Sequence, residues 1–247
     1  MLFKNIAVLD SEFKPRENMF LGTSGDKIAY FDQKPPHKPF GAEYDGRNKL
    51  LMPAFINCHT HTPMTVLRGY GENMTLQDWL HDRIFPFEDK LIKKDAYNAT
   101  LLGIAEMLKY GTVSCTDMYM FGEEAVKAMS ESGMKCNFGR PLTVFEPDAE
   151  LEDLACFKEA EMLYKTYNNA ENGRIKIDMS VHAEYTSNAK TVAQMAAFCQ
   201  EIGAHMHVHL SETKLEHEEC KQRHNGQTPA QYFNSLGLFA SPTTAAH

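Results

Sequence analysis

Two short histidine patterns hold the residues best suited to chemistry in this sequence. His59 and His61 close a largely apolar segment, residues 50–61, which we predict to be a buried β-strand. Residues two positions apart on a strand point to the same side, so both imidazoles would meet at the strand's C-terminal end. A bare His-x-His pair more often lies on a surface, but this pair follows an apolar strand and a second histidine-rich strand comes later. We therefore predict half of a zinc or iron site.

The second pattern is a predicted strand within residues 204–213, whose alternating histidines share one face: His205, His207 and His209. Glu212 lies three residues beyond His209, where a loop can bring it toward a metal. A histidine ligand with a nearby carboxylate suits hydrolysis, because the histidine holds the metal and the carboxylate moves protons. We predict a functional role for His209 and Glu212, whereas His205 and His207 are expected to fill a polar barrel interior.

Length and composition set the broad class of protein. The 247 residues suffice for one large α/β domain, and the net charge of -8 argues against general nucleic-acid binding. No apolar stretch has the length needed to span a bilayer, and the N-terminus lacks a signal peptide's apolar run. The six cysteines are scattered without a C-x-x-C pair, as expected of reduced thiols. We expect a cytoplasmic protein without nucleic-acid or membrane partners.

The spacing of apolar residues predicts two domains. Residues 1–49 show short strands at 5–9, 18–21 and 27–31 and a proline-rich break at 33–39, which indicates the N-terminal part of a small β-sandwich module. From residue 50 to residue 247, strands alternate with helices. After the first strand, the predicted strands cover residues 112–119, 135–144, 175–182, 204–213 and the opening of a sixth at 243–247. The predicted helices cover residues 95–110, 123–132, 151–167, 189–202 and 228–236.

This alternation predicts an α/β fold with a parallel sheet. Polar candidates fall at the C-terminal ends of the predicted strands: His59, His61, Asp117, Arg140, His182, His209 and His247. A (β/α)₈ TIM-type barrel keeps its active site at that end, so we predict an incomplete barrel with five to six strands present. A doubly wound open sheet would also fit the alternation, but it would gather five strand ends around one metal less easily.

An ordered set of motifs resembles the amidohydrolase superfamily. Within it, the set is most similar to the 5′-methylthioadenosine/S-adenosylhomocysteine deaminases and the related chlorohydrolases. The motifs are Leu51-Met-Pro-Ala-Phe-Ile-Asn-Cys-His-Thr-His61, Leu67-Arg-Gly69, Leu76-Gln-Asp-Trp-Leu80, Ile84-Phe-Pro-Phe-Glu88, Thr116-Asp-Met-Tyr119, His207-Val-His-Leu-Ser-Glu-Thr213 and Ala245-Ala-His247. The resemblance covers the whole chain, and the ordered set is more specific for the superfamily than for a substrate.

The resemblance implies roles for eight residues. The metal ligands would be His59, His61 and His209; Glu212 would shuttle the proton and His247 would polarise the water or the developing tetrahedral centre; Glu88 would bind ribose hydroxyls, and Arg140 and His182 would contact substrate. Trp79 is expected either near this pocket or in the core, and Asp117 is expected to be structural.

The function implied is hydrolytic deamination of an adenine nucleoside. The substrate would be 5′-methylthioadenosine, S-adenosylhomocysteine or adenosine, and the products the inosine analogue and ammonia. The cofactor would be one Zn²⁺ per site, with Fe²⁺ as the alternative metal. The alternatives in function are another hydrolase of C–N or C–Cl bonds, acting on a triazine, guanine or cytosine-type substrate, and an inactive or split-enzyme fragment.

Two departures from the family pattern affect these expectations. The family's final metal ligand is an aspartate on the eighth strand, and this sequence stops before that strand. We therefore expect a C-terminally truncated chain, with a homo-oligomer or a complementary C-terminal fragment as partner. The stretch at residues 146–152 is acidic where the family often has an arginine, which weakens the case for a substrate with a negatively charged tail.

Overall fold

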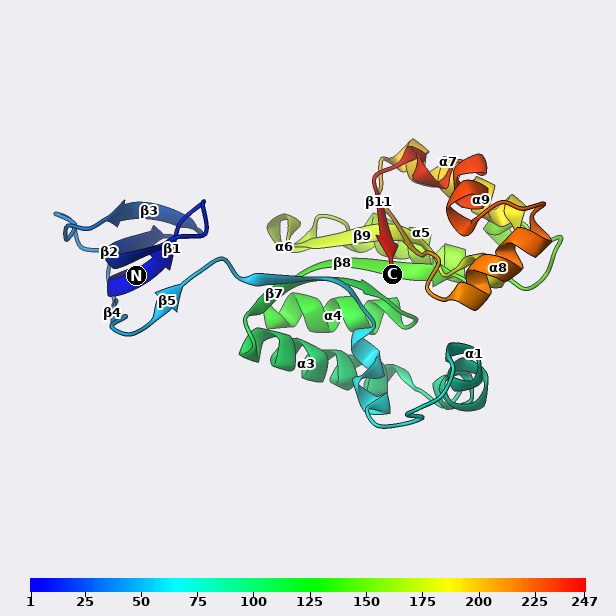
Figure 1. Ribbon diagram of the computed structural model, residues 1–247, viewed down its shortest axis with the longest axis horizontal. Helices are drawn as coiled ribbons and strands as arrows, with labels where there is room; N and C mark the ends of the chain where they lie inside the picture. The colour runs from blue at the N-terminus through cyan, green and yellow to red at the C-terminus, as the bar shows by residue number, and fades with distance from the viewer. The chain divides into compact units, whose positions relative to one another are not determined.

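Five short strands form the sheet of the N-terminal part of the chain. In the computed structural model, which describes residues 1–247, this part is the compact unit Met1–Ala54, and the second unit is Phe55–His247 (Figure 1). The strands are β1 (Leu2–Leu9), β2 (Pro15–Ser24), β3 (Lys27–Asp32), β4 (Glu43–Asp45) and β5 (Leu50–Leu51). β2 runs antiparallel to β1 and β3, while β4 and β5 run parallel to β1. A small cluster of buried side chains packs on this sheet: Ile6, Val8, Met19 and Leu21.

The apolar stretch from residue 50 to residue 61 is divided between the two units. Leu50 and Leu51 pair with β1, and Pro53, which has no N–H to donate to a ladder, separates them from β6 (Phe55–Thr60). The prediction of one buried strand is wrong here, because Phe55 and Ile56 are 56% and 66% exposed. β6 is the end strand of its sheet and has β7 as its only ladder partner.

A six-stranded parallel sheet organises the second unit, in the order β6-β7-β8-β9-β10-β11. The remaining strands are β7 (Thr112–Met118), β8 (Lys135–Leu142), β9 (Ile175–Val181), β10 (Met206–His209) and β11 (Thr243–Ala246). Each strand lies beside its predecessor in the chain, which is the order of a TIM-type barrel, whereas a doubly wound sheet reverses its order at a switch point. The rings of His59 on β6 and His247 after β11 lie 5.2 Å apart, so the sheet curves until its two end strands approach each other. The predicted fold class is confirmed.

Helices connect successive strands, and the four longest pack against the sheet (Figure 1). The longer ones are α3 (Lys93–Lys109), α4 (Gly122–Ser132), α5 (Ala155–Tyr167), α7 (Ala189–Ile202), α8 (Lys214–Arg223) and α9 (Pro229–Ser235); the short ones are α1 (Leu76–Trp79), α2 (Phe85–Glu88) and α6 (Ala170–Gly173). The ends of α4 and α7 fall at Gly133 and Gly203, whose φ angles of 83° and 65° favour glycine. No helix combines the length and apolar character needed to cross a membrane.

The core of this unit lies between the sheet and the helices. Its strand side consists of fully buried apolar residues, including Phe138, Ile177, Met179, Met206 and Val208. Its helix side consists of residues at helical spacing, such as Val126 and Met129 on α4 and Val192 and Met195 on α7. This packing holds the strands rigidly, and their C-terminal ends then define the positions of the polar side chains described next.

Candidate active site

Three histidines from two strands that are distant in sequence converge on one point. His59 lies on β6, His61 follows that strand directly, and His209 ends β10. His209 Nε2 lies 3.1 Å from His59 Nε2 and 3.2 Å from His61 Nε2. The structure therefore brings together the three residues that the sequence analysis singled out as metal ligands, with one nitrogen of each directed to the same place.

The second ring nitrogen of each histidine is engaged elsewhere. His209 Nδ1 lies 2.8 Å from the carbonyl oxygen of His182, and His61 Nδ1 contacts the carbonyl oxygen of Met118. A carbonyl can only accept, so each of these Nδ1 atoms carries the proton and each Nε2 keeps a free lone pair. His59 Nδ1 lies 2.9 Å from Nε2 of another histidine, His207.

The electrostatics of the cluster favour neutral imidazoles. Burial, aided by the neighbouring imidazoles, lowers the pKa of His59 to about 4 and the pKa of His209 to about 2. Neutral imidazole nitrogens are the ligands that Zn²⁺ and Fe²⁺ accept readily. The donor set and the shared direction of the three Nε2 atoms fit a divalent metal ion of this kind.

A cavity of about 720 Å³ opens beside the three histidines. Its wall includes all of the predicted site residues: His59, His61, Glu88, Arg140, His182, His209, Glu212 and His247. Trp79 and Tyr185 also line it, which resolves the two expectations for Trp79 in favour of the pocket. The cavity is large enough for a small organic ligand.

Glu212 and His247 face each other at the edge of the histidine cluster. His247 Nε2 lies 3.7 Å from Glu212 Oε2, and its ring lies 5.4 Å from that of His209. Glu212 is held through its backbone, whose N–H donates to Glu216 Oε2 at 2.8 Å. A carboxylate and an imidazole placed side by side can move a proton or steady a developing charge.

Glu216 is a buried residue that our sequence analysis missed. Its carboxylate also accepts from the N–H of Ser211 at 3.2 Å, so it fixes the loop that carries Glu212. Thr213 caps α8 by accepting from the N–H of Glu216 at 3.1 Å. The signal was present in the sequence, because Thr213-Lys-Leu-Glu216 has the S/T-x-x-E spacing of a helix start.

Two carboxylates form hydrogen bonds with polar residues that line the cavity, Tyr119 and Arg140. The hydroxyl of Tyr119 donates to Glu88 Oε1 at 2.5 Å, while burial raises the pKa of Glu88. Arg140 donates from Nε to Glu159 Oε2 at 2.6 Å and from its NH1 group to the carbonyl of Pro141 at 2.8 Å. The Arg140 guanidinium is thus already paired within the protein.

His182 reaches the cavity from the end of β9. Its Nδ1 lies 2.8 Å from the hydroxyl oxygen of Thr186, and its ring lies 4.9 Å from that of His209. Burial, aided by His61, lowers the pKa of His182 to about 4. Its imidazole is therefore a neutral lining group.

Three more polar residues from the sequence analysis, Asp117, His205 and His207, lie in different environments. Asp117 is fully buried and accepts hydrogen bonds from the N–H of Thr62 at 2.9 Å and the N–H of Met118 at 3.1 Å, which is a structural role. The prediction that His205 fills the barrel interior is wrong, since His205 precedes the strand and is exposed. His207 is interior and fully buried, and it contacts a predicted metal ligand, His59.

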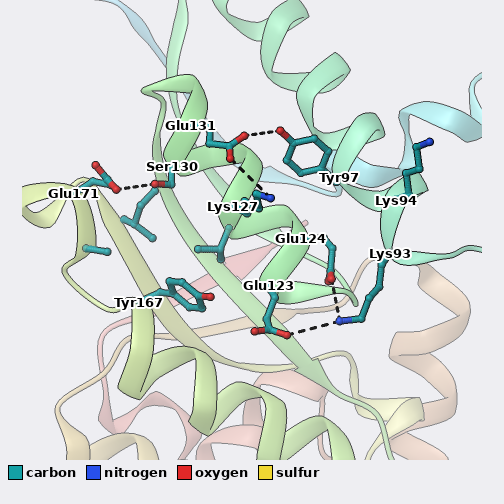
Figure 2. Close-up of a pocket in the computed structure, with 13 residues that line it drawn as sticks. Lys93, Lys94, Tyr97, Glu123, Glu124, Lys127, Ser130, Glu131, Tyr167 and Glu171 are labelled. Atoms are coloured by element: carbon teal, nitrogen blue, oxygen red, sulfur yellow. Dashed lines mark hydrogen bonds and ion pairs between the residues drawn. The ribbon is translucent and has the colours of Figure 1, made fainter.

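A second hollow, of about 590 Å³, lies among the helices α3, α4, α5 and α6. Figure 2 shows ion pairs of Lys93 with Glu123 and Glu124 and of Lys127 with Glu131. Lys93 Nζ lies 3.0 Å from Glu124 Oε1, and the hydroxyl of Ser130 donates to Glu171 at 2.7 Å. No histidine or cysteine lines it, so the cavity at the strand ends is the candidate active site.

Comparison with known proteins gives the family. A model of the amidohydrolase family matches residues 50–247. The 5-methylthioadenosine/S-adenosylhomocysteine deaminase of Thermoanaerobacter pseudethanolicus is 36% identical over 100% of this chain and 57% of its own length. The 5'-deoxyadenosine deaminase of Methanosphaera stadtmanae is 36% identical over 82% of this chain and 47% of its own length. The chain spans about half the length of these curated relatives.

Solved structures share the fold. A zinc-bound adenosine deaminase from Xanthomonas campestris superposes with a TM-score of 0.83 at 24% identity, covering 99% of this chain and 56% of that one. A guanine deaminase from C. acetobutylicum gives a TM-score of 0.89 at 21% identity, covering 100% and 62%. Because the family model extends over most of the sequence and the barrel strands follow the same architecture, the chain belongs to the amidohydrolase family.

Proposed function

We propose that the protein is a metal-dependent hydrolase that deaminates adenine nucleosides to the corresponding inosine compounds and ammonia. The observation that carries this proposal is the convergence of three imidazole nitrogens beside Glu212 and His247 at the mouth of one cavity. The names of the relatives described above, which are deaminases of adenine nucleosides, support the choice of substrate.

The metal would be held by His59, His61 and His209, and zinc or iron(II) suits these ligands. A bound ion of this kind supplies Lewis-acid chemistry that makes water a nucleophile near neutral pH. The carbonyl partners of His61 and His209 orient both rings, as outer-shell acceptors do in metal sites.

Glu212 and His247 would handle the protons and charge of the reaction. Glu212 takes one proton from the attacking water and delivers it to a ring nitrogen of the purine as the water oxygen bonds to the amine-bearing carbon. The second proton of that water then passes to the amine, and the C–N bond breaks to release ammonia. His247, 3.7 Å from Glu212, stabilises the charge that develops at that carbon's substituents. The hydrogen bond from the backbone N–H of Glu212 to the carboxylate of Glu216 holds Glu212 in place during the proton transfers.

The sugar would bind to other residues that line the cavity. Glu88 has one carboxylate oxygen engaged by Tyr119, which leaves the other to accept from ribose hydroxyls. Arg140 and His182 would contact the substrate as well. Because Arg140 is already neutralised by Glu159, the site favours an uncharged nucleoside such as 5′-methylthioadenosine or adenosine over S-adenosylhomocysteine, which carries a carboxylate.

A substrate panel with a paired variant tests this function. We expect ammonia release from 5′-methylthioadenosine and adenosine, and none from guanine, cytosine or a chlorinated triazine. Glu212→Gln should lower turnover by about 10²–10⁴-fold, the usual contribution of a positioned acid or base. Glu218→Gln, at an exposed position on α8, is the matched control and should leave turnover unchanged. Release of ammonia from guanine alone, or full activity of Glu212→Gln, would overturn the proposal.

Three further expectations from the sequence stay predictions. They are the assignment of residues 1–49 to a small β-sandwich module, a homo-oligomer or complementary C-terminal fragment as partner, and a cytoplasmic location. The native mass in solution tests the second of these, because a mass above the 28.0 kDa of this chain indicates a partner.

A further inference from the structure

Two buried side-chain atoms lack a hydrogen-bond partner, and the proposed mechanism uses neither of them. They are the hydroxyl oxygen of Ser180 and Nδ1 of His207. Both residues are completely buried. Ser180 on β9 is the register partner of His207 on β10, so the two side chains start side by side on the same face of neighbouring strands. Buried polar groups are rarely left unpaired, so this pair requires an explanation.

The other nitrogen of His207 touches a predicted metal ligand. His207 Nε2 lies 2.9 Å from His59 Nδ1, and His59 Nε2 lies 3.1 Å from His209 Nε2. Between two neutral imidazoles, one nitrogen must donate and the other must accept. If His59 donates from Nδ1, its Nε2 keeps the lone pair that binds a metal, and the single proton of His207 sits on Nδ1. If His207 donates instead, the proton of His59 sits on Nε2 and blocks metal binding.

His59 is unlike the other two ligands in this respect. His61 and His209 each donate a hydrogen bond from Nδ1–H to a backbone carbonyl. A carbonyl can only accept, so the backbone sets the tautomers of these two rings. The tautomer of His59 is set by a side chain that can adopt either form. The state of His207 therefore decides whether the third nitrogen is free to bind.

We propose that His207 is a positioning residue that holds His59 in the metal-binding tautomer, and that a buried water links His207 Nδ1–H to the hydroxyl of Ser180. The inference rests on the proposed metal-dependent function. An ordered water accepts from His207 and exchanges a hydrogen bond with Ser180, which satisfies both orphaned atoms at once. The relay runs from Ser180 through the water and His207 to His59, and it places the imidazole lone pair of His59 at the site.

Zinc affinity, measured by competition with a chelating dye, tests the relay. His207→Phe removes the acceptor and should weaken binding by about 10–100-fold, the range found for outer-shell partners of metal-ligating histidines. His207→Gln keeps an amide oxygen that can accept and should restore part of the affinity. Ser180→Ala should cause a smaller loss, because the water keeps its other contacts. His205→Gln, two residues earlier and exposed, is the control and should bind zinc like the unmodified chain.

Nitrogen-15 NMR of the histidine rings gives a second readout that needs no variant to fold. We expect His207 to carry its proton on Nδ1 with and without zinc, and His59 to carry its proton on Nδ1. A proton on Nε2 of His207, or unchanged zinc affinity in a folded His207→Phe, would overturn the inference. If the unmodified chain binds no zinc, the proposed metal-dependent function fails, while the ring spectra still decide the direction of the hydrogen bond.

Discussion

Burial sets the behaviour of individual residues at the strand ends. Taking a charged imidazole out of water is costly, so burial lowers the pKa of His207 to about 3 and that of His182 to about 4, and both rings are neutral near pH 7. The same effect acts in the opposite direction on acids, since burial raises the pKa of Asp117 to about 6 despite the hydrogen bonds that Thr62 donates to it. A metal would therefore meet free nitrogen lone pairs rather than protonated rings.

Asp178 on β9 allows a test of this effect away from the ligands. Burial raises its pKa from 3.8 to about 6, against the opposing influence of His205 and of a hydrogen bond from Asn137. The folded state then holds the proton more tightly than the unfolded state, so the stability linked to it is present below pH 4 and is lost as the pH rises to 6. Relative to Asp178→Asn, the free energy of unfolding of the native chain should fall by about 2 kcal/mol between pH 4 and pH 6.

Urea unfolding of both proteins between pH 4 and pH 8 measures the difference. Asp148→Asn, at an exposed position, is the matched control and should track the native chain throughout. The prediction is wrong if the difference in the free energy of unfolding between the native chain and Asp178→Asn stays constant with pH. It is also wrong if the native chain gains stability relative to Asp178→Asn as the pH rises.

Elements next to the cavity are joined by one buried carboxylate. Glu184, in the turn after β9, accepts from Arg223 at 2.5 Å and from His224 at 2.7 Å, both at the end of α8. The bond ties the turn that carries Tyr185 to the helix that follows Glu212. Cys220 lies close enough to complete a three-ligand set with Glu184 and His224, but the Arg223 guanidinium occupies the carboxylate, so we interpret the cluster as a structural anchor.

We expect the two carboxylates that pair with the Arg223 guanidinium to contribute unequally to the free energy of unfolding. Glu184, whose side chain is 2% exposed, and Glu219, at 46%, both pair with Arg223. Glu184→Gln should lower the free energy of unfolding by about 2 kcal/mol, because it weakens the hydrogen bonds that a buried carboxylate accepts from Arg223 and His224. Glu219→Gln should cost less than about 1 kcal/mol, as exposed pairs do. Chemical denaturation of both variants measures the two losses of stability. Equal losses would mean that burial of Glu184 does not strengthen its interaction with Arg223.

Local sequence patterns predict some elements better than others. The helix at residues 189–202 coincides with α7, and α9 lies within one residue of the predicted range 228–236 at each end, because capping residues and apolar spacing agree there. Helix α8 was not predicted, since only two of its residues, Glu216 and Cys220, are buried and it shows no apolar stripe. Pro53 is a local signal for the division of residues 50–61, but no local pattern reveals that Leu50 and Leu51 pair with β1.

The architecture of the whole barrel unit follows from alternation of strands and helices, but the site's finer contacts do not. His59 and His207 are 148 positions apart in the chain, and their hydrogen bond exists because the curved sheet brings β6 opposite β10. The sequence could therefore indicate which histidines come together, since they fall at strand ends. It could not indicate which residue orients His59, because that depends on the curvature of six strands together.

Metal analysis of the purified chain decides whether these histidines hold a metal ion. We expect one zinc or iron ion per chain that survives dialysis and is lost in His209→Ala, with Glu218→Gln retaining it. The variant should remain folded, because His209 sits at the end of its strand and only its imidazole is removed. A metal-free native chain that takes up no zinc, or the same metal content in His209→Ala, would show that these histidines do not form the metal centre.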